Sequence, residues 1–141
     1  MVVAIGMLAG CSAGSPSSAS TDLSWQLGAL EANWNLTVPD GVRLVAYYSS
    51  DPGPHGEHDA VYVLADDSRD GAWVSGAFGA LGEAGSKLLD RIESSAAASG
   101  VAPDSADILC KPAISQNQDD RLVLCKESAD SGREFVFESI Q

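Results

Sequence analysis

Two histidines stand three residues apart in one short stretch of the chain. His55 and His58 lie between Asp51 and Asp59, in a segment that is rich in Gly and Pro and also contains Glu57. Imidazole and carboxylate groups are ligands of zinc, nickel and copper, so His55, His58, Glu57, Asp59 and Asp51 are candidate metal ligands. A closed zinc site needs four well-held ligands, and no cysteine is near. The alternatives are a polar loop whose imidazoles face water, and a pH sensor, because imidazole titrates near neutrality.

A cysteine follows an apolar run at the front of the chain. The run extends from Val2 to Leu8 and continues into Leu8-Ala9-Gly10-Cys11. This tetrad resembles the lipobox of bacterial lipoproteins, and the resemblance implies a diacylglyceryl group on the Cys11 thiol and a mature chain that starts at Cys11. A signal peptide carries Lys or Arg before its apolar core. Because Val2 follows Met1 directly, we expect the true start to lie upstream. The alternative is a cytosolic protein with a frayed apolar N-terminus and a buried Cys11.

The chain has three cysteines. If Cys11 carries lipid, Cys110 and Cys125 are left as a pair, and an exported chain reaches an oxidising compartment in which a disulfide is the expected state. The closed loop of about 15 residues would contribute roughly 3 kcal/mol in the chain-entropy model. The two residues lack the close spacing of a zinc site and the C-x-x-C arrangement of a redox pair.

Composition bounds the domain organisation and the partners. The 141 residues carry a net charge of −12. Such an acidic surface repels nucleic acid phosphates and anionic lipid headgroups, so nucleic acid is not expected as a partner. We expect a signal peptide at 1–10, a flexible Ser-rich tether at 11–21 and one domain at 22–141.

Residue periodicity predicts the elements of this domain. Leu23, Leu27, Leu30 and Trp34 recur at helical spacing, and this helix should end near Asn35. Trp25 falls off the apolar stripe of the helix and should be partly exposed. A second helix is expected over 79–99, and strands over 42–48, 60–65, 106–113, 121–127 and 133–140.

The order of these elements predicts an α+β fold. We expect a mostly antiparallel sheet of about five strands, covered on one face by two helices, in the order α-β-β-α-β-β-β. Cys110 and Cys125 would lie on neighbouring strands. In the last strand, Phe135 and Phe137 are expected to face inward, and Glu134 and Glu138 outward.

Part of the chain is similar to a second group, the small exported proteins of Gram-positive bacteria. The matching segments are Val38-Pro39, then Tyr47 to Asp51, then His55 to Asp59 of the loop 51–59 (the histidine loop) before Val61-Tyr62-Val63, and the hairpin from Arg121 to Ser139. This resemblance implies the same order of secondary-structure elements and export from the cytosol. It brings no known activity, so no catalytic residue is implied.

Catalytic motifs are not found in the sequence. There is no Gly-x-Ser-x-Gly elbow, no Walker or dinucleotide glycine motif, and both histidines lie in one loop. We therefore expect a non-enzymatic lipoprotein on the extracytoplasmic face of the cell membrane, whose domain binds an envelope protein, a peptide or a small ligand. The alternative is a metal-binding or metal-sensing module built on the loop 51–59, and a small hydrolase ranks last.

Overall fold

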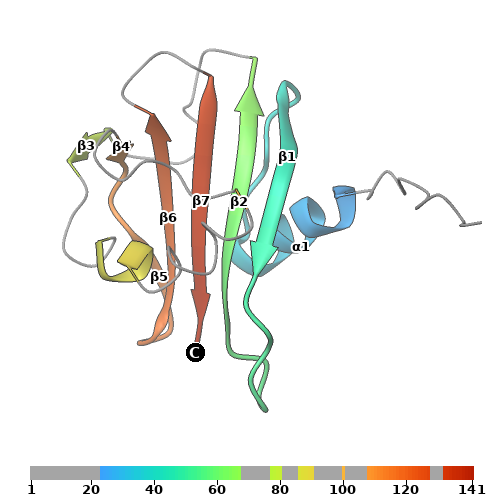
Figure 1. Ribbon diagram of the computed structural model, residues 1–141, viewed down its shortest axis with the longest axis vertical. Helices are drawn as coiled ribbons and strands as arrows, with labels where there is room; N and C mark the ends of the chain where they lie inside the picture. Colours follow the sequence, from blue (N-terminus) through green and yellow to red (C-terminus); the bar gives the residue numbers. More distant parts are fainter. Residues whose placement is uncertain (1–22, 68–76, 81–85, 91–99, 101–107, 128–131) are drawn as a thin grey trace, which may run out of the picture.

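The computed structural model describes residues 23–67, 77–80, 86–90, 100, 108–127 and 132–141 (Figure 1). Within these residues there is one helix, α1 (Ser24–Trp34), a helical turn at 86–90, and seven strands. The strands are β1 (Val42–Ser49), β2 (His58–Asp66), β3 (Gly79–Ala80), β4 (Ile108–Cys110), β5 (Ile114–Gln116), β6 (Asp120–Glu127) and β7 (Arg133–Ile140).

All seven strands belong to one antiparallel sheet, which confirms the predicted α+β class. The order across the sheet is β1-β2-β7-β6-β4-β3, and β5 pairs with β6 beside this path. The chain therefore places its last strand, β7, at the centre, between β2 and β6 (Figure 1). The long pairings of β2, β7 and β6 form the middle of the sheet, to which the shorter strands attach.

The sheet is covered on both faces. Residues 60–64 of β2 are all buried, and successive side chains of a strand point to opposite faces. We call one side the disulfide face and the other the α1 face. The core of the disulfide face consists of Val61, Val63, Leu88, Leu89, Ile108, Cys110, Val123, Cys125, Phe135 and Phe137. The core of the α1 face consists of Leu30, Trp34, Val42, Ala60, Tyr62, Leu64, Leu122, Leu124 and Val136.

Three details of the predicted fold are wrong. The two helical segments do not share a face, because Leu30 of α1 belongs to one core and Leu88 and Leu89 of the turn 86–90 belong to the other. The sheet has seven strands rather than about five, since Gly79–Ala80 forms β3 where a helix was expected. The single strand expected over 106–113 stops at Cys110, ahead of Pro112, and β5 follows as a separate strand. The rest of the expected second helix lies outside the described residues.

The end of α1 sets how the helix leads into the sheet. Asn35 adopts a left-handed conformation with φ 50°, and its N–H donates to the Glu31 carbonyl, which ends the helix at the predicted place. The Glu31 carboxylate then accepts the Val38 N–H at 2.7 Å. A tight turn follows, in which the Val42 N–H donates to the Pro39 carbonyl. These contacts bring β1 back alongside the helix that precedes it.

The predicted disulfide joins Cys110 of β4 to Cys125 of β6. The two residues are direct register partners, and their Cα atoms lie 4.0 Å apart. The bridge therefore ties the short strand β4 to the long strand β6 within the core of the disulfide face. In the described part of the chain, no helix is both long and apolar enough to cross a bilayer.

Candidate functional site

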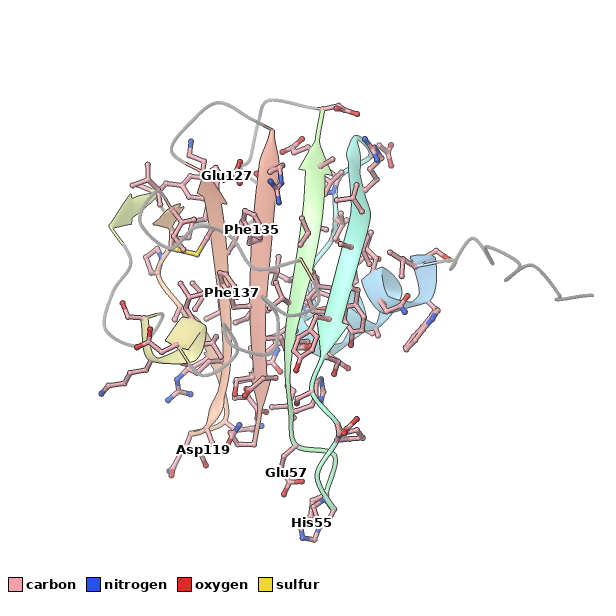
Figure 2. The ribbon with its side chains drawn as sticks, in the orientation of Figure 1. His55, Glu57, Asp119, Glu127, Phe135 and Phe137 are labelled. Carbon is pink, nitrogen blue, oxygen red and sulfur yellow. A yellow bond between two sulfur atoms is a disulfide. The ribbon has the colours of Figure 1, made fainter. Side chains whose placement is uncertain are left out.

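The histidine loop closes on itself. Between β1 and β2, the Gly53 N–H donates to the Glu57 carbonyl at 2.8 Å, and the Gly56 N–H donates to the Gly53 carbonyl at 3.0 Å. Gly56 has φ +90°, a conformation that suits glycine. The Glu57 carboxylate accepts the His55 N–H at 2.9 Å, so one of its oxygens already serves the loop backbone. His55 itself is exposed at the tip of the loop (Figure 2).

The second histidine belongs to the sheet rather than to the loop. His58 is the first residue of β2, and its ring Nδ1 lies 2.9 Å from the Gly56 carbonyl. That carbonyl can only accept, so this contact places the proton on Nδ1. The other ring nitrogen, Nε2, lies 3.5 Å from a carboxylate oxygen of Glu138 on β7. His58 is therefore half-buried against the sheet and does not project beside His55.

The five candidate metal ligands are not gathered around one point. His58 and Asp59 are consecutive strand residues, so their side chains point to opposite faces of the sheet. Asp51 is exposed, and the Glu57 carboxylate accepts a backbone hydrogen bond in the loop. Among the residues whose structure is described, no group of three or more His, Cys, Asp or Glu side chains could hold a metal ion.

Instead, the structure builds a polar cluster around Glu138, whose side chain is completely buried. The indole N–H of Trp34 on α1 donates to its Oε1 at 2.7 Å, and the Tyr62 hydroxyl on β2 donates to its Oε2 at 2.8 Å. With His58 these residues form what we call the Glu138 network. The register explains the arrangement, because Glu138 pairs with Ala60 and Tyr62 and His58 lie two residues to either side of Ala60, on the same face.

Burial raises the pKa of the Tyr62 phenol in this network. The pKa of Tyr62 is raised far above its ordinary value, first because burial disfavours the phenolate and then because the phenol faces the Glu138 carboxylate. Tyr47 of β1 packs on Tyr62 with ring centroids 5.0 Å apart, and adds to the same shift. Tyr62 therefore stays a proton donor, which is the form that a carboxylate acceptor needs.

A second polar group lies further along the same face. Glu134 of β7 is buried and is the register partner of Lys126 on β6. The ammonium groups of Lys126 and Lys111 lie 4.7 and 5.0 Å from the ring centroid of Phe78, within range of a cation–π interaction. Burial lowers the pKa of Lys111, and the negative charge of Glu134 partly opposes this shift. The α1 face thus buries two carboxylates, with Val136 between them.

The sequence prediction for these carboxylates is wrong. Glu134 and Glu138 alternate with Phe135 and Phe137. This alternation predicts a strand with one buried face and one solvent-exposed face, with the glutamates on the exposed face. The strand is central, however, and residues 134–139 are all buried. A usable signal was present in Ala60 to Leu64 of β2, because an uninterrupted apolar run is typical of a strand covered on both faces. A strand paired with it is then covered on both faces as well.

The network joins α1 to the middle of the sheet. Each Glu138 oxygen accepts from a donor of the protein itself, and these donors come from α1 and β2. The arrangement is therefore suited to holding the helix in one position rather than to binding a substrate. In comparisons with known proteins, no family model, no curated protein and no solved structure matches this chain.

Proposed function

We propose that the protein is a lipoprotein anchored to the extracytoplasmic face of the cell membrane through diacylglycerol on Cys11. The observation that carries this proposal is the pairing of Cys110 with Cys125. The chain has three cysteines, so the bridge leaves Cys11 as the thiol for another role. A disulfide between neighbouring core strands also suits an oxidising compartment, which agrees with the export signal that Leu8-Ala9-Gly10-Cys11 resembles.

The proposed role of the domain is to bind an envelope protein, a peptide or a small ligand without catalysing a reaction. The binding end would be the end of the sheet at which two exposed loops, residues 50–57 and 117–119, connect the strands. The register supports this grouping, because His58 pairs with Ile140 and Arg121 pairs with Ser139. His55 and Asp119 accordingly lie toward the same end of the molecule in Figure 2. Exposed loops held by a rigid scaffold are common binding sites.

The anchor is tested by labelling the protein expressed from its own gene in its native host. Radiolabelled palmitate should follow the wild-type protein into the membrane fraction, and should be absent from a Cys11→Ser variant. Cys110→Ala is the matched control, because it also removes one cysteine but should leave the label in place. A wild-type protein without label, or a Cys11→Ser variant that keeps it, would contradict the proposal.

The binding role is tested by placing a photo-crosslinker at His55 or Asp119 in the same cells. A discrete crosslinked species should form from these positions and not from Val45, which is exposed on β1. Equal crosslinking from all three positions would indicate random encounter and would count against a binding end.

A further inference from the structure

The outward surface of α1 is uncharged, although the protein as a whole is strongly acidic. Its exposed residues carry no charge: they are Ser24, Trp25, Gly28, Ala32 and Asn33. The acidic side chain on the helix, Glu31, is half-buried and accepts the Val38 N–H. A neutral helix surface on a chain of net charge −12 meets less local electrostatic repulsion from an anionic body than a surface that carries carboxylates.

This surface presents a large aromatic side chain to solvent. Trp25 is 66 % exposed, whereas Trp34 on the opposite side of the same helix is 4 % exposed and bound to Glu138. Indole has an apolar body and one polar N–H, and for this reason tryptophan is enriched at the interface between membrane and water. Trp34 thus binds the helix to the sheet, whereas Trp25 faces solvent.

The position of α1 in the chain brings this surface close to the proposed anchor. Eleven residues lie between the Cys11 position and Leu23, the residue before the helix. Even a fully extended chain of that length spans no more than about 40 Å. A lipid on Cys11 would therefore hold α1 near the bilayer at a high effective concentration, at which a weak contact becomes populated.

We propose that the outward surface of α1 rests on the membrane, with Trp25 in the headgroup region. This proposal rests on the lipid anchor proposed above and adds an orientation to it. The Glu138 network fixes α1 against the sheet, so contact through α1 orients the whole domain. The α1 surface then takes the lipid contact, and the two connections of the binding end remain available to a partner.

The test uses the full-length lipidated protein reconstituted in phosphatidylcholine vesicles that contain brominated phosphatidylcholine. Bromine within the bilayer quenches the fluorescence of tryptophans in contact with it. We expect quenching in the wild-type protein and loss of most of it in Trp25→Ser. A Trp25→Ser, His55→Trp variant is the matched control, since it has the wild-type number of tryptophans but carries one at the loop tip. Quenching should not return in this control.

Flotation of the same vesicles separates failure of the inference from failure of the anchor. If wild type and Trp25→Ser both float but show equal quenching, the anchor stands and the α1 contact is refuted. Restored quenching in the His55→Trp control would also refute it, because the domain would then have no fixed orientation. If the wild-type protein does not float, or Cys11→Ser floats equally well, the anchor fails and the inference fails with it.

Discussion

The two faces of the sheet are closed by different means. The disulfide face packs Phe135 and Phe137 against Leu88 and Leu89, and its covalent link is the bridge between β4 and β6. The α1 face packs Leu30 and Trp34 against the same strands but also buries Glu134 and Glu138. β7 contributes to both faces, with its phenylalanines on one side and its glutamates on the other.

This difference between the two faces distinguishes packing of the core from positioning of the helix α1. An apolar core tolerates many side-chain arrangements of similar total volume. The disulfide links two strands and does not determine the orientation of a helix. A buried carboxylate is costly unless its hydrogen bonds are made. Glu138 therefore favours the one placement of α1 in which the Trp34 N–H reaches it. We infer that the disulfide face supplies much of the stability and that the α1 face supplies the defined position of the helix.

The largest effect is expected on the disulfide face. Phe137 is fully buried, and Phe137→Ala should lower the free energy of unfolding by about 4 kcal/mol, because it removes buried apolar area and leaves a cavity. Chemical denaturation of the two proteins measures the difference. The control is Val45→Ala on the exposed part of β1, which should change stability by less than about 0.5 kcal/mol. A loss at Phe137 as small as that at Val45 would show that this face is not packed.

Glu138→Leu should cost about 3 kcal/mol, because it leaves the Trp34 N–H buried without an acceptor and takes the carboxylate acceptor from the Tyr62 hydroxyl. Glu138→Gln should cost less, since its amide oxygen still accepts one bond. The informative variant adds Trp34→Phe and Tyr62→Phe to Glu138→Leu, and it should recover part of the loss, since no donor is then left unpaired. If Glu138→Leu alone is neutral, the contrast between the two faces does not hold.

Removing the bridge should have an effect of similar or slightly smaller size. The sequence separation of 15 residues corresponds to about 3 kcal/mol in the chain-entropy model. The double variant Cys110→Ala, Cys125→Ala should unfold at correspondingly lower denaturant, and a reducing agent should then have no further effect on it. Wild-type stability that is indifferent to reduction would mean that the disulfide does not contribute.

Tyr62→Phe should have a smaller effect that depends on pH. At neutral pH it removes one hydrogen bond to a carboxylate, worth about 1.5 kcal/mol. The folded pKa of Tyr62 lies above its unfolded value of about 10. The contribution of Tyr62 to the free energy of unfolding is therefore fully present below pH 10 and is lost as the pH rises above 10. Denaturation midpoints measured up to alkaline pH should fall more steeply for wild type than for Tyr62→Phe, and parallel curves would contradict the assignment.

The smallest effect concerns the end of the sheet that carries the histidine loop. Because the candidate ligands point in different directions, adding zinc, nickel or copper should leave the melting temperature unchanged. A bound ion held far above its dissociation constant would raise stability by a few kcal/mol. A rise that disappears in His55→Ala, His58→Ala would overturn this expectation and restore the metal-binding hypothesis.

Local patterns predicted much of the fold. The spacing of Leu30 and Trp34 predicted α1, and β-branched and aromatic runs predicted the four long strands. The pairing of Cys110 with Cys125 followed from the number of cysteines and from the proposed export. The short strands β3 and β5 carry too few residues for a periodic signal. The side of the sheet on which each helix packs depends on contacts distant in sequence, which periodicity does not encode.

The candidate site was much harder to predict. The histidine loop is rich in residue types that bind metals, yet β2 begins at His58, whose ring faces Glu138. Glu138 itself was assigned to solvent, because one strand read alone does not reveal whether it is central. Its partners Trp34 and Tyr62 lie 104 and 76 residues away in sequence, so only the assembled sheet brings the network together.

The intact mass of the protein extracted from membranes of its native host tests the lipid anchor and the disulfide together. We expect a chain that starts at Cys11, carries a diacylglyceryl group there, and contains a disulfide between Cys110 and Cys125. A mature protein that retains Leu8-Ala9-Gly10 ahead of an unmodified Cys11, or that has free thiols at Cys110 and Cys125, would contradict this expectation.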